Sequence, residues 1–388
     1  MIPRSLAEKV LEMATRFPVV SITGPRQSGK STLVKSLFPA YRYVTLEDVD
    51  MRAFAQEDPR SFLAHYADRV ILDEAQRAPE LFSYLQGAVD AAGTPGQYII
   101  SGSQNFLLME AISQSLAGRV AVMNLYPFSA RELDEAKMLP ARIDDLLLTG
   151  GYPRIYDARI SPADYYPSYI QTYLERDVRA GAGILKLSEF DRFLALSADR
   201  TAQVLNREKL ARDCGITTKT AESWLSVLEA SFIAFRLQPY YRNFGKRVVK
   251  SPKLYLCDTG LASSLLGIEE PEDLMFSSHR GALFETAVVS EVVKAFAARG
   301  RRAKLYYWRD ASNKEIDLVI EKGARPSALI EVKSSATYAP KFFNTLSELA
   351  ELMDVPVGRR YVVYAGDESF DTKKGEVVAL KDIARVVA

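Results

Sequence analysis

The sequence has few of the residues on which zinc sites and histidine-dependent catalysis rely. Its 388 residues include two cysteines, Cys214 and Cys257, and two histidines, His65 and His279. The cysteines lie far apart and lack C-x-x-C spacing, which argues against zinc and indicates a reducing compartment. With two histidines, the chain offers neither a histidine-rich metal site nor a histidine-based catalytic triad.

A strong net charge and long apolar runs are missing as well. The formal net charge is +1, so no overall basic field indicates a nucleic acid, and such a partner has to be sought in local patches. No run of 18 apolar residues is present, and residues 1–5 lack the apolar core of a signal peptide. We therefore expect a cytoplasmic protein with no membrane partner.

Residues 24–31 read Gly-Pro-Arg-Gln-Ser-Gly-Lys-Ser and fit the phosphate-binding pattern G-x-x-x-x-G-K-[ST]. An apolar strand is expected before them at 19–23, and residues 32–38 have the spacing of a helix. Glycines let the backbone approach a phosphate closely, and the amide groups and the helix N-terminus attract its charge. Lys30 can reach the β- and γ-phosphates of ATP, and the Ser31 hydroxyl can ligate Mg²⁺. The expected contacts of ATP are Gly24, Pro25, Arg26, Gln27, Ser28, Gly29, Lys30, Ser31 and Thr32.

An apolar strand that ends in two carboxylates is expected at residues 70–74. The carboxylates are Asp73 and Glu74, and the C-terminal end of a buried strand is where open α/β sheets bind ligands. Asp73 would hold the Mg²⁺ shell, and Glu74 would orient or activate the attacking water. An exposed acidic turn is the alternative, which the phosphate-binding loop upstream disfavours.

Another strand is expected at residues 97–101, and polar residues follow it. Ser103, with Gln104 in reserve, would lie between the two preceding motifs and contact the γ-phosphate or the attacking water. A serine that caps the helix expected from Phe106 onward is an equally good interpretation.

The order of these segments resembles the AAA+ ATPase core. After the polar strand end, a helix ends at Arg119 and a strand is expected at residues 120–125. In that family an arginine in this place completes the site of a neighbouring subunit. The resemblance therefore implies a homo-oligomer in which Arg119 acts in trans. The alternative is an arginine that complements the dipole of its own helix.

A helical region is expected after the motif Gly-Gly-Tyr-Pro at residues 150–153. The motif resembles one that lies near the adenine in the signalling branch of P-loop ATPases, which implies a nucleotide contact for Pro153. Farther along, Tyr165, Tyr169 and Tyr173 recur at helical spacing. Such a stripe could stack nucleic-acid bases, but a packing face is the favoured interpretation.

Two helices joined by a short turn are expected at residues 207–216 and 217–225, as in a helix-turn-helix. Residues 240–253 follow as an expected two-stranded wing with five basic residues, Lys253 among them, and no acid. A basic wing suits the DNA backbone, although winged helices also bind proteins and Glu222 would repel phosphate. The expected DNA contacts are Lys219, Thr220, Ser223, Arg242, Lys246, Arg247 and Lys250.

A second set of carboxylates lies in the last third of the chain. Glu285 is on an expected long helix, Asp317 is on a strand, and Glu331 stands two residues before Lys333 on the next strand. The set resembles the PD-(D/E)xK nucleases, in which two carboxylates on adjacent strands hold a metal that polarises the phosphate. Glu285 would complete the metal shell and Lys333 would orient the water. Because Ile316 replaces the usual proline, a nuclease-like fold kept for binding alone is the favoured alternative.

Taken together, these motifs resemble a group of bacterial and archaeal AAA-type ATP-binding proteins with a C-terminal nuclease-like domain. The expected fold is α/β, with an AAA+-like P-loop core at 1–150, a helical lid at 151–205, a winged helix-turn-helix at 206–262 and a restriction-endonuclease-like domain at 263–388. The expected function is that of a Mg²⁺-dependent ATPase that acts on DNA. Two alternatives stay open: a slowly hydrolysing nucleotide switch that binds a protein, and an ATP-gated, metal-dependent nuclease.

Overall fold

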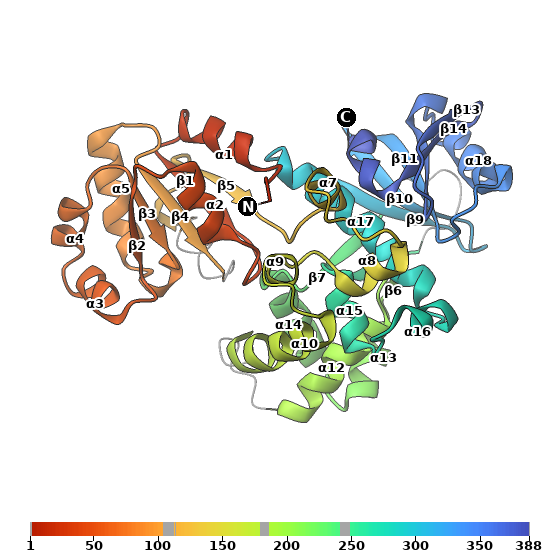
Figure 1. Cartoon of the computed structure of the whole chain (residues 1–388), viewed down its shortest axis with the longest axis horizontal. Coiled ribbons are helices and arrows are strands. Elements are labelled where there is room, and N and C mark those ends of the chain that lie inside the picture. The colour runs from red at the N-terminus through yellow and green to blue at the C-terminus, as the bar shows by residue number, and fades with distance from the viewer. Residues whose placement is uncertain (1, 104–111, 113, 179–185, 241–248, 388) are drawn as a thin grey trace. The chain divides into compact units, whose positions relative to one another are not determined.

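The computed structural model describes residues 2–103, 112, 114–178, 186–240 and 249–387 (Figure 1). Internal contacts divide the chain into two units, residues 1–128 with 297–301 and residues 129–296 with 302–388. Each unit is described by itself. The first boundary lies after Phe128, and the expected division into four domains stays a prediction.

The first unit is built on a five-stranded parallel sheet with the strand order β2-β3-β4-β1-β5. The strands are β1 (Val19–Thr23), β2 (Arg42–Thr45), β3 (Val70–Asp73), β4 (Tyr98–Gly102) and β5 (Val120–Asn124). Because all five strands are parallel, the loop after β1 and the polar ends of β3 and β4 meet at one edge of the sheet. This arrangement confirms the α/β class and the parallel core.

Helices cover both faces of this sheet, as expected for strands that are apolar on both sides (Figure 1). Val10, Leu33 and Val34 pack on one face, and Phe62 and Leu85 pack on the other. The helices are α1 (Ala7–Ala14), α2 (Lys30–Leu37), α3 (Val49–Glu57), α4 (Pro59–His65), the short η1 (Ala75–Arg77) and α5 (Leu81–Ala92).

The second unit begins with helices, and the tyrosine stripe is part of their core. Its first elements are α7 (Ala130–Glu135), α8 (Ile143–Thr149), α9 (Pro153–Asp157), α10 (Pro162–Tyr169), the π-helical segment η2 (Ile170–Val178) and α12 (Leu187–Asp199). Tyr165, Tyr169 and Tyr173 are buried, and the hydroxyls of Tyr152 and Tyr169 lie 3.0 Å apart. The tyrosines therefore form the expected packing face, and no ring is left to stack on a base.

The glycine motif before α9 is held by a buried carboxylate, Asp258. Its Oδ2 accepts a hydrogen bond from Gly151 N over 2.8 Å, and its Oδ1 accepts from Leu261 N over 3.0 Å. The Tyr166 hydroxyl lies 2.8 Å from both Asp258 Oδ1 and Thr149 O. Since Asp258 is 3% exposed, neutral donors take the place of water around its charge.

Tyr166→Phe is expected to lower the free energy of unfolding by about 1.5–3 kcal/mol, because it removes a donor to a buried charge. Tyr156→Phe is the matched control, since the Tyr156 hydroxyl donates to the neutral carbonyl of Gly150. We expect the control to lose only about 0.5–1.5 kcal/mol. Urea denaturation followed by circular dichroism measures both, and equal losses would contradict a special role for Asp258.

Three strands surround the helix-turn-helix segment. The elements are β6 (Gln203–Val204), α13 (Arg207–Cys214), α14 (Thr218–Ala230), β7 (Ala234–Pro239) and β8 (Lys253–Leu256). Strand β8 pairs antiparallel with β6 and with β7. The middle of the expected wing, residues 241–248, lies outside the described residues, and Arg242, Lys246 and Arg247 fall within it.

The rest of the second unit extends the same sheet to nine strands, in the order β13-β14-β12-β11-β10-β9-β7-β8-β6. The added elements are α15 (Thr259–Leu265), α16 (Pro271–Phe276), α17 (Arg280–Ala298), β9 (Leu305–Arg309), β10 (Glu315–Lys322), β11 (Arg325–Lys333), η3 (Pro340–Phe343), α18 (Asn344–Leu352), η4 (Val357–Arg359), β12 (Arg360–Tyr364), β13 (Phe370–Thr372), β14 (Gly375–Ala379) and η5 (Leu380–Val387).

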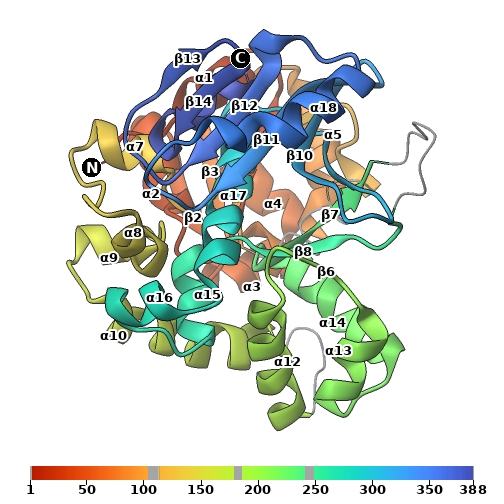
Figure 2. The ribbon, with the colours of Figure 1, turned by 90° about the vertical axis from the view of Figure 1, so that its right-hand side faces the viewer.

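Strands β9, β10 and β11 form an antiparallel meander, and β12 runs parallel to β11. Helix α18 packs against β10, β11 and β12 (Figure 2). Its Leu346 and Leu349 belong to the same hydrophobic cluster as Val319, Leu329 and Val362. Because β7 pairs with β9, the segments expected as a winged helix and as a nuclease-like domain share one sheet.

Candidate nucleotide site and acidic cluster

The phosphate-binding loop depends on glycine at its first position. Gly24 has a φ of +153°, and a Cβ added there would lie 2.1 Å from the carbonyl oxygen of Leu125. Gln27 and Gly29 also have positive φ, at +61° and +91°, and Gly29 is the N-cap of α2. These turns form the tight cradle that the motif predicts between β1 and α2.

Lys30 lies inside this cradle and is 5% exposed. Its Nζ donates to Pro25 O over 2.8 Å and to Gly24 O over 3.1 Å. Burial lowers the pKa of Lys30 to about 8, although the nearby charges of Glu74 and Asp73 act in the opposite direction. Among the described residues, the buried Ser28 Oγ has no hydrogen-bond partner. A buried ammonium and a spare hydroxyl in one loop fit the oxygens of a phosphate chain.

Asp73, the expected Mg²⁺ ligand, accepts hydrogen bonds from three side chains. Its Oδ2 accepts hydrogen bonds from Ser31 Oγ over 2.7 Å and from Tyr43 OH over 2.5 Å. Its Oδ1 accepts from Ser101 Oγ, also over 2.5 Å. Ser31 and Asp73 are therefore adjacent, as expected of the pair that would hold Mg²⁺.

Sequence reasoning missed Tyr43 and Ser101. They come from β2 and β4, the two strands on either side of β3. Burial, together with the hydrogen bond to Asp73, raises the pKa of the Tyr43 hydroxyl, which therefore stays a proton donor. The available signal was a serine in the otherwise apolar strand before Gly102.

Glu74 follows β3 in a left-handed backbone conformation, with φ +53° and ψ +40°. This conformation is energetically unfavourable for a residue with a Cβ, and such strained positions cluster at functional sites. Glu74 Oε2 accepts from Ser103 Oγ over 3.0 Å and from Gln76 Nε2. Ser103 thus lies beside Glu74, and Gln104, its reserve, lies outside the described residues.

The remaining expected nucleotide residues lie at the rim or outside this unit. Arg26 pairs with Glu47 over 3.3 Å, and Thr32 is exposed on α2. Pro153 belongs to the second unit, where it is buried in the first turn of α9. Its expected contact with the adenine stays a prediction.

Arg119 makes a two-pronged ion pair within its own chain. Its Nε and Nη2 donate to the two carboxylate oxygens of Asp90 on α5, over 2.5 and 2.8 Å. The side chain is 33% exposed. The expected role of Arg119 at a neighbouring subunit's site stays a prediction, and Asp90 competes for the guanidinium.

The expected DNA-contacting residues of the first turns of α14 lie on its surface. Lys219 and Ser223 are exposed, and Thr220 closes the helix cap through Thr217 Oγ1, which accepts from Thr220 N over 3.1 Å. Lys250 is also exposed. Glu222, expected to repel phosphate, forms ion pairs with Arg207 and Arg236 over 3.1 and 2.6 Å. These pairs offset its charge and reduce that repulsion.

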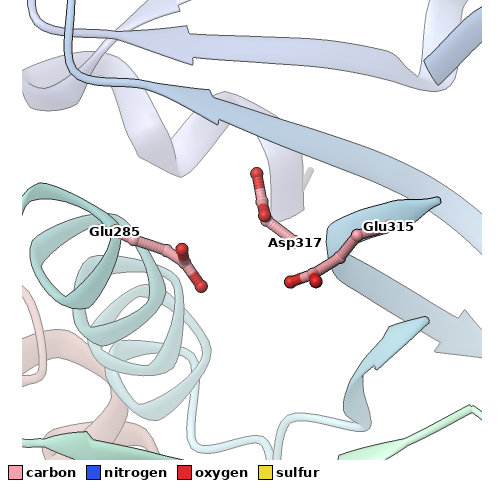
Figure 3. A group of neighbouring side chains, drawn as sticks. All are labelled: Glu285, Glu315 and Asp317. Atoms are coloured by element: carbon pink, nitrogen blue, oxygen red, sulfur yellow. The ribbon is translucent and has the colours of Figure 1, made fainter. Parts of the chain in front are cut away.

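The carboxylates that lie together in the second unit are not the three that were expected. Oxygens of Glu285 on α17 and of Glu315 and Asp317 on β10 all lie within 4.8 Å of one another (Figure 3). We call these three residues the acidic cluster. Glu331, expected as the third metal ligand, instead pairs with Lys333 over 2.6 Å. Sequence reasoning missed Glu315, although it stands two residues before Asp317 on the same strand, where side chains share a face.

A lysine from the expected basic wing enters this cluster. Lys253 begins β8, and its side chain is 3% exposed. Its Nζ lies 2.8 Å from Glu285 Oε1 and forms a second ion pair with Glu315. Lys253, counted among the five basic residues of the expected wing, is therefore not available to a DNA backbone, because its side chain is buried.

Burial raises the pKa of three carboxyl groups in this region, those of Glu285, Asp317 and Glu331. The pKa of Glu285 rises to about 7 and that of Glu331 to about 8, and each is raised further by the charge of Asp317. Burial also raises the pKa of Asp317. Burial alone would lower the pKa of Lys253, but Glu285, Asp317 and Glu315 raise it, so this lysine keeps its proton.

The cluster does not fit a divalent cation while Lys253 is in this place. The Lys253 ammonium already pairs with two of the three residues that would hold the metal. Strand β11 does not bring Glu331 into the set, and Val332 N donates to Asp317 Oδ2 over 2.7 Å. No nuclease step through a metal is therefore derived for this site.

No helix among the described residues is long and apolar enough to cross a membrane.

Comparison with known protein families matches three successive segments of the chain. Residues 16–134 match the family described as AAA domain, and residues 140–272 and 280–383 match two families described as domains of unknown function. An uncharacterised protein of Mycobacterium tuberculosis, Rv2008c, is 32% identical over 372 residues, 95% of this chain and 81% of the relative. An uncharacterised protein of Haemophilus influenzae is 24% identical over 280 residues, which are 63% of this chain and 68% of the relative.

The solved structures that match this chain do so at lower sequence identity. The Walker-type ATPase PABY2304 of Pyrococcus abyssi matches 68% of this chain and 96% of its own, at 15% identity and a TM-score of 0.43. The ORC2 protein of Aeropyrum pernix, in its ADP form, matches 70% of this chain and 93% of its own, at 15% identity and a TM-score of 0.33.

Proposed function

This chain belongs to the family of the mycobacterial protein Rv2008c, and from that premise and the loop geometry we propose that it is a Mg²⁺-dependent ATPase that acts on DNA. The match of residues 16–134 to the AAA domain family supports nucleotide binding by the phosphate-binding loop of the first unit. The observation that carries the proposal is the contact of Ser31 with Asp73 beside the buried Lys30, all at the same edge of the sheet.

Each side chain has a distinct task in the proposed reaction. Lys30 would exchange the carbonyls of Gly24 and Pro25 for phosphate oxygens, and its charge would stabilise the transition state. Ser31 and Asp73 would hold Mg²⁺, which neutralises developing charge on the phosphates. Glu74 would accept a hydrogen bond from the attacking water and orient it, after release from Ser103 and Gln76.

The DNA part of the proposal is supported by the elements around α14. The chain order of one strand, two helices and two strands, with β8 pairing to both β6 and β7, supports the proposed winged helix. Lys219 and Ser223 are exposed at the start of α14, where a recognition helix presents its base-contacting residues. The ion pairs of Glu222 with Arg207 and Arg236 reduce its repulsion of DNA phosphates.

ATP turnover with no DNA and with duplex, single-stranded or branched DNA tests the whole proposal. We expect DNA to raise the rate of ATP turnover. We also expect the affinity of the protein for DNA to fall steeply as the salt concentration rises. The absence of both effects would favour the alternative, a slow nucleotide switch that binds a protein. That alternative has one observation in its favour, since two donors, Gln76 and Ser103, already occupy Oε2 of Glu74.

Lys219→Ala is expected to weaken binding to all DNA sequences alike and to reduce the salt slope of the binding constant by about 1, because it removes one phosphate contact. Lys373→Ala, at an exposed position in the β13–β14 turn, is the matched control and is expected to leave the slope unchanged. Fluorescence anisotropy across a salt series measures both slopes. An unaltered slope for Lys219→Ala would remove α14 from the proposed DNA surface.

Arg119→Ala is expected to lower kcat about tenfold, less than a full arginine finger, because Asp90 competes for the side chain. Mixing Arg119→Ala chains with Lys30→Ala chains should restore part of the lost turnover, since a mixed oligomer contains one intact composite site. Arg16→Ala, at an exposed ion pair on the surface of the first unit, serves as control. Turnover that does not recover on mixing would contradict action in trans.

A further inference from the structure

The acidic cluster already contains a cation, the ammonium of Lys253. This residue does not come from α17 or β10, the helix and the strand that carry Glu285, Glu315 and Asp317. It comes from β8, which β9 and β7 separate from β10 in the sheet order. The ammonium pairs with Glu285 and Glu315 and also lies 5.5 Å from the centre of the Tyr307 ring. A carboxylate pair and an aromatic face together compensate a buried positive charge.

The sheet fixes Lys253 in this position. Strand β8 lies between β6 and β7, and Lys253 pairs with Val204 on one side and with Leu237 on the other. Side chains two residues apart on a strand share a face, so Lys253 and Tyr255 project together. The Tyr255 hydroxyl donates to Glu285 Oε1 over 2.6 Å. One strand therefore delivers both a positive charge and a hydrogen-bond donor to Glu285.

A divalent metal would need the oxygens that Lys253 holds. Metals such as Mg²⁺ bind carboxylate oxygens at about 2.0–2.1 Å with a demanding geometry. Such an ion would meet the ammonium at short range among partly buried carboxylates, where like charges repel more strongly than they do in water. Withdrawing Lys253 is also costly, because its side chain is 3% exposed and would stay buried without its partners.

We infer that Lys253 is the resident cation of the acidic cluster, which therefore binds no divalent metal and cleaves no nucleic acid in the native protein. Removing the positive charge should convert the cluster into a metal site. This inference concerns the second unit alone and does not depend on ATP hydrolysis.

The test measures Mn²⁺ binding to the full chain by electron paramagnetic resonance, in the absence of nucleotide. Every chain carries Ser31→Ala, so that the nucleotide site does not contribute. We expect no bound Mn²⁺ in the chain that keeps Lys253, and one bound ion after Lys253→Met, which preserves the length of the side chain. Adding Asp317→Asn to Lys253→Met should weaken that binding at least about tenfold, since even partners outside the metal shell are worth about 10–100-fold.

Two results would overturn the inference. One is a Mn²⁺ ion bound by the chain that keeps Lys253 and lost on Glu285→Gln. The other is a folded Lys253→Met chain that binds no Mn²⁺. If Lys253→Met fails to fold, the test is Mn²⁺ binding by the chain that keeps Lys253, compared with the same chain carrying Glu285→Gln.

Plasmid cleavage gives an independent readout. Supercoiled DNA incubated with the native chain and Mg²⁺ or Mn²⁺ is expected to stay intact. Metal-dependent nicking that disappears in Asp317→Asn would show an active metal site and overturn the inference.

Discussion

Replacing Glu74 by glutamine is expected to lower kcat by about 10²–10⁴ while ATP affinity changes little. The glutamine keeps the size of the side chain and can still accept a hydrogen bond from Ser103, but it cannot take a proton from water. The contacts of Lys30, Ser31 and Asp73 are untouched, so ATP should still bind. The variant should therefore accumulate with ATP bound and unhydrolysed.

Single-turnover hydrolysis together with equilibrium binding of a fluorescent ATP analogue separates these two effects. Glu80→Gln is the matched control, because it makes the same change at an exposed position shortly after Glu74. We expect the control to hydrolyse ATP at the native rate. Native turnover in Glu74→Gln would show that another group positions the water, and Ser103 would then be the first to examine.

Lys30→Ala is expected to lower kcat/KM by about 10²–10³, because it removes a buried charged donor from the phosphate site. In contrast to Glu74→Gln, this variant should also lose affinity for the nucleotide. The reason is that Lys30 would contact the phosphates in the ground state as well as in the transition state. Titration with a fluorescent ATP analogue and steady-state turnover give both quantities.

Lys9→Ala controls for the loss of a positive charge in the first unit, since Lys9 pairs with Glu12 away from the loop. We expect it to bind ATP as the native chain does. Native ATP affinity in Lys30→Ala would mean that residues 24–31 do not form the triphosphate site. It would also remove the basis for the proposed ATPase.

The nucleotide site could be predicted from sequence because its main parts are local. A loop of eight residues fixes the spacing of Gly24, Gly29 and Lys30, and an apolar strand of four residues fixes the place of Asp73 and Glu74. The parallel order then follows from alternating strands and helices, which bring these strand ends to one edge. The tyrosine stripe was predictable for the same reason, since helical periodicity alone put its residues on one face.

The partners of those residues were decided by neighbouring strands. Tyr43 and Ser101 reach Asp73 because β2 and β4 lie beside β3. A serine in an otherwise apolar strand was the one local signal for Ser101, and it does not name Asp73 as the partner. The same holds for Asp90, which pairs with Arg119 from a helix earlier in the chain. Side-chain contacts across strands depend on sheet order and register, which the residue types alone do not specify.

The second unit shows most clearly which contacts the sequence alone cannot predict. The sequence by itself determined the phosphate-binding loop, its acidic strand end and an α/β core, because these rest on short spacings and on periodicity. Only the tertiary structure decided that Lys253 leaves the expected basic wing and pairs with Glu285 and Glu315. The physical reason is the pairing of β7 with β9, which joins two segments into one sheet and makes a lysine of the expected wing a buried counter-charge.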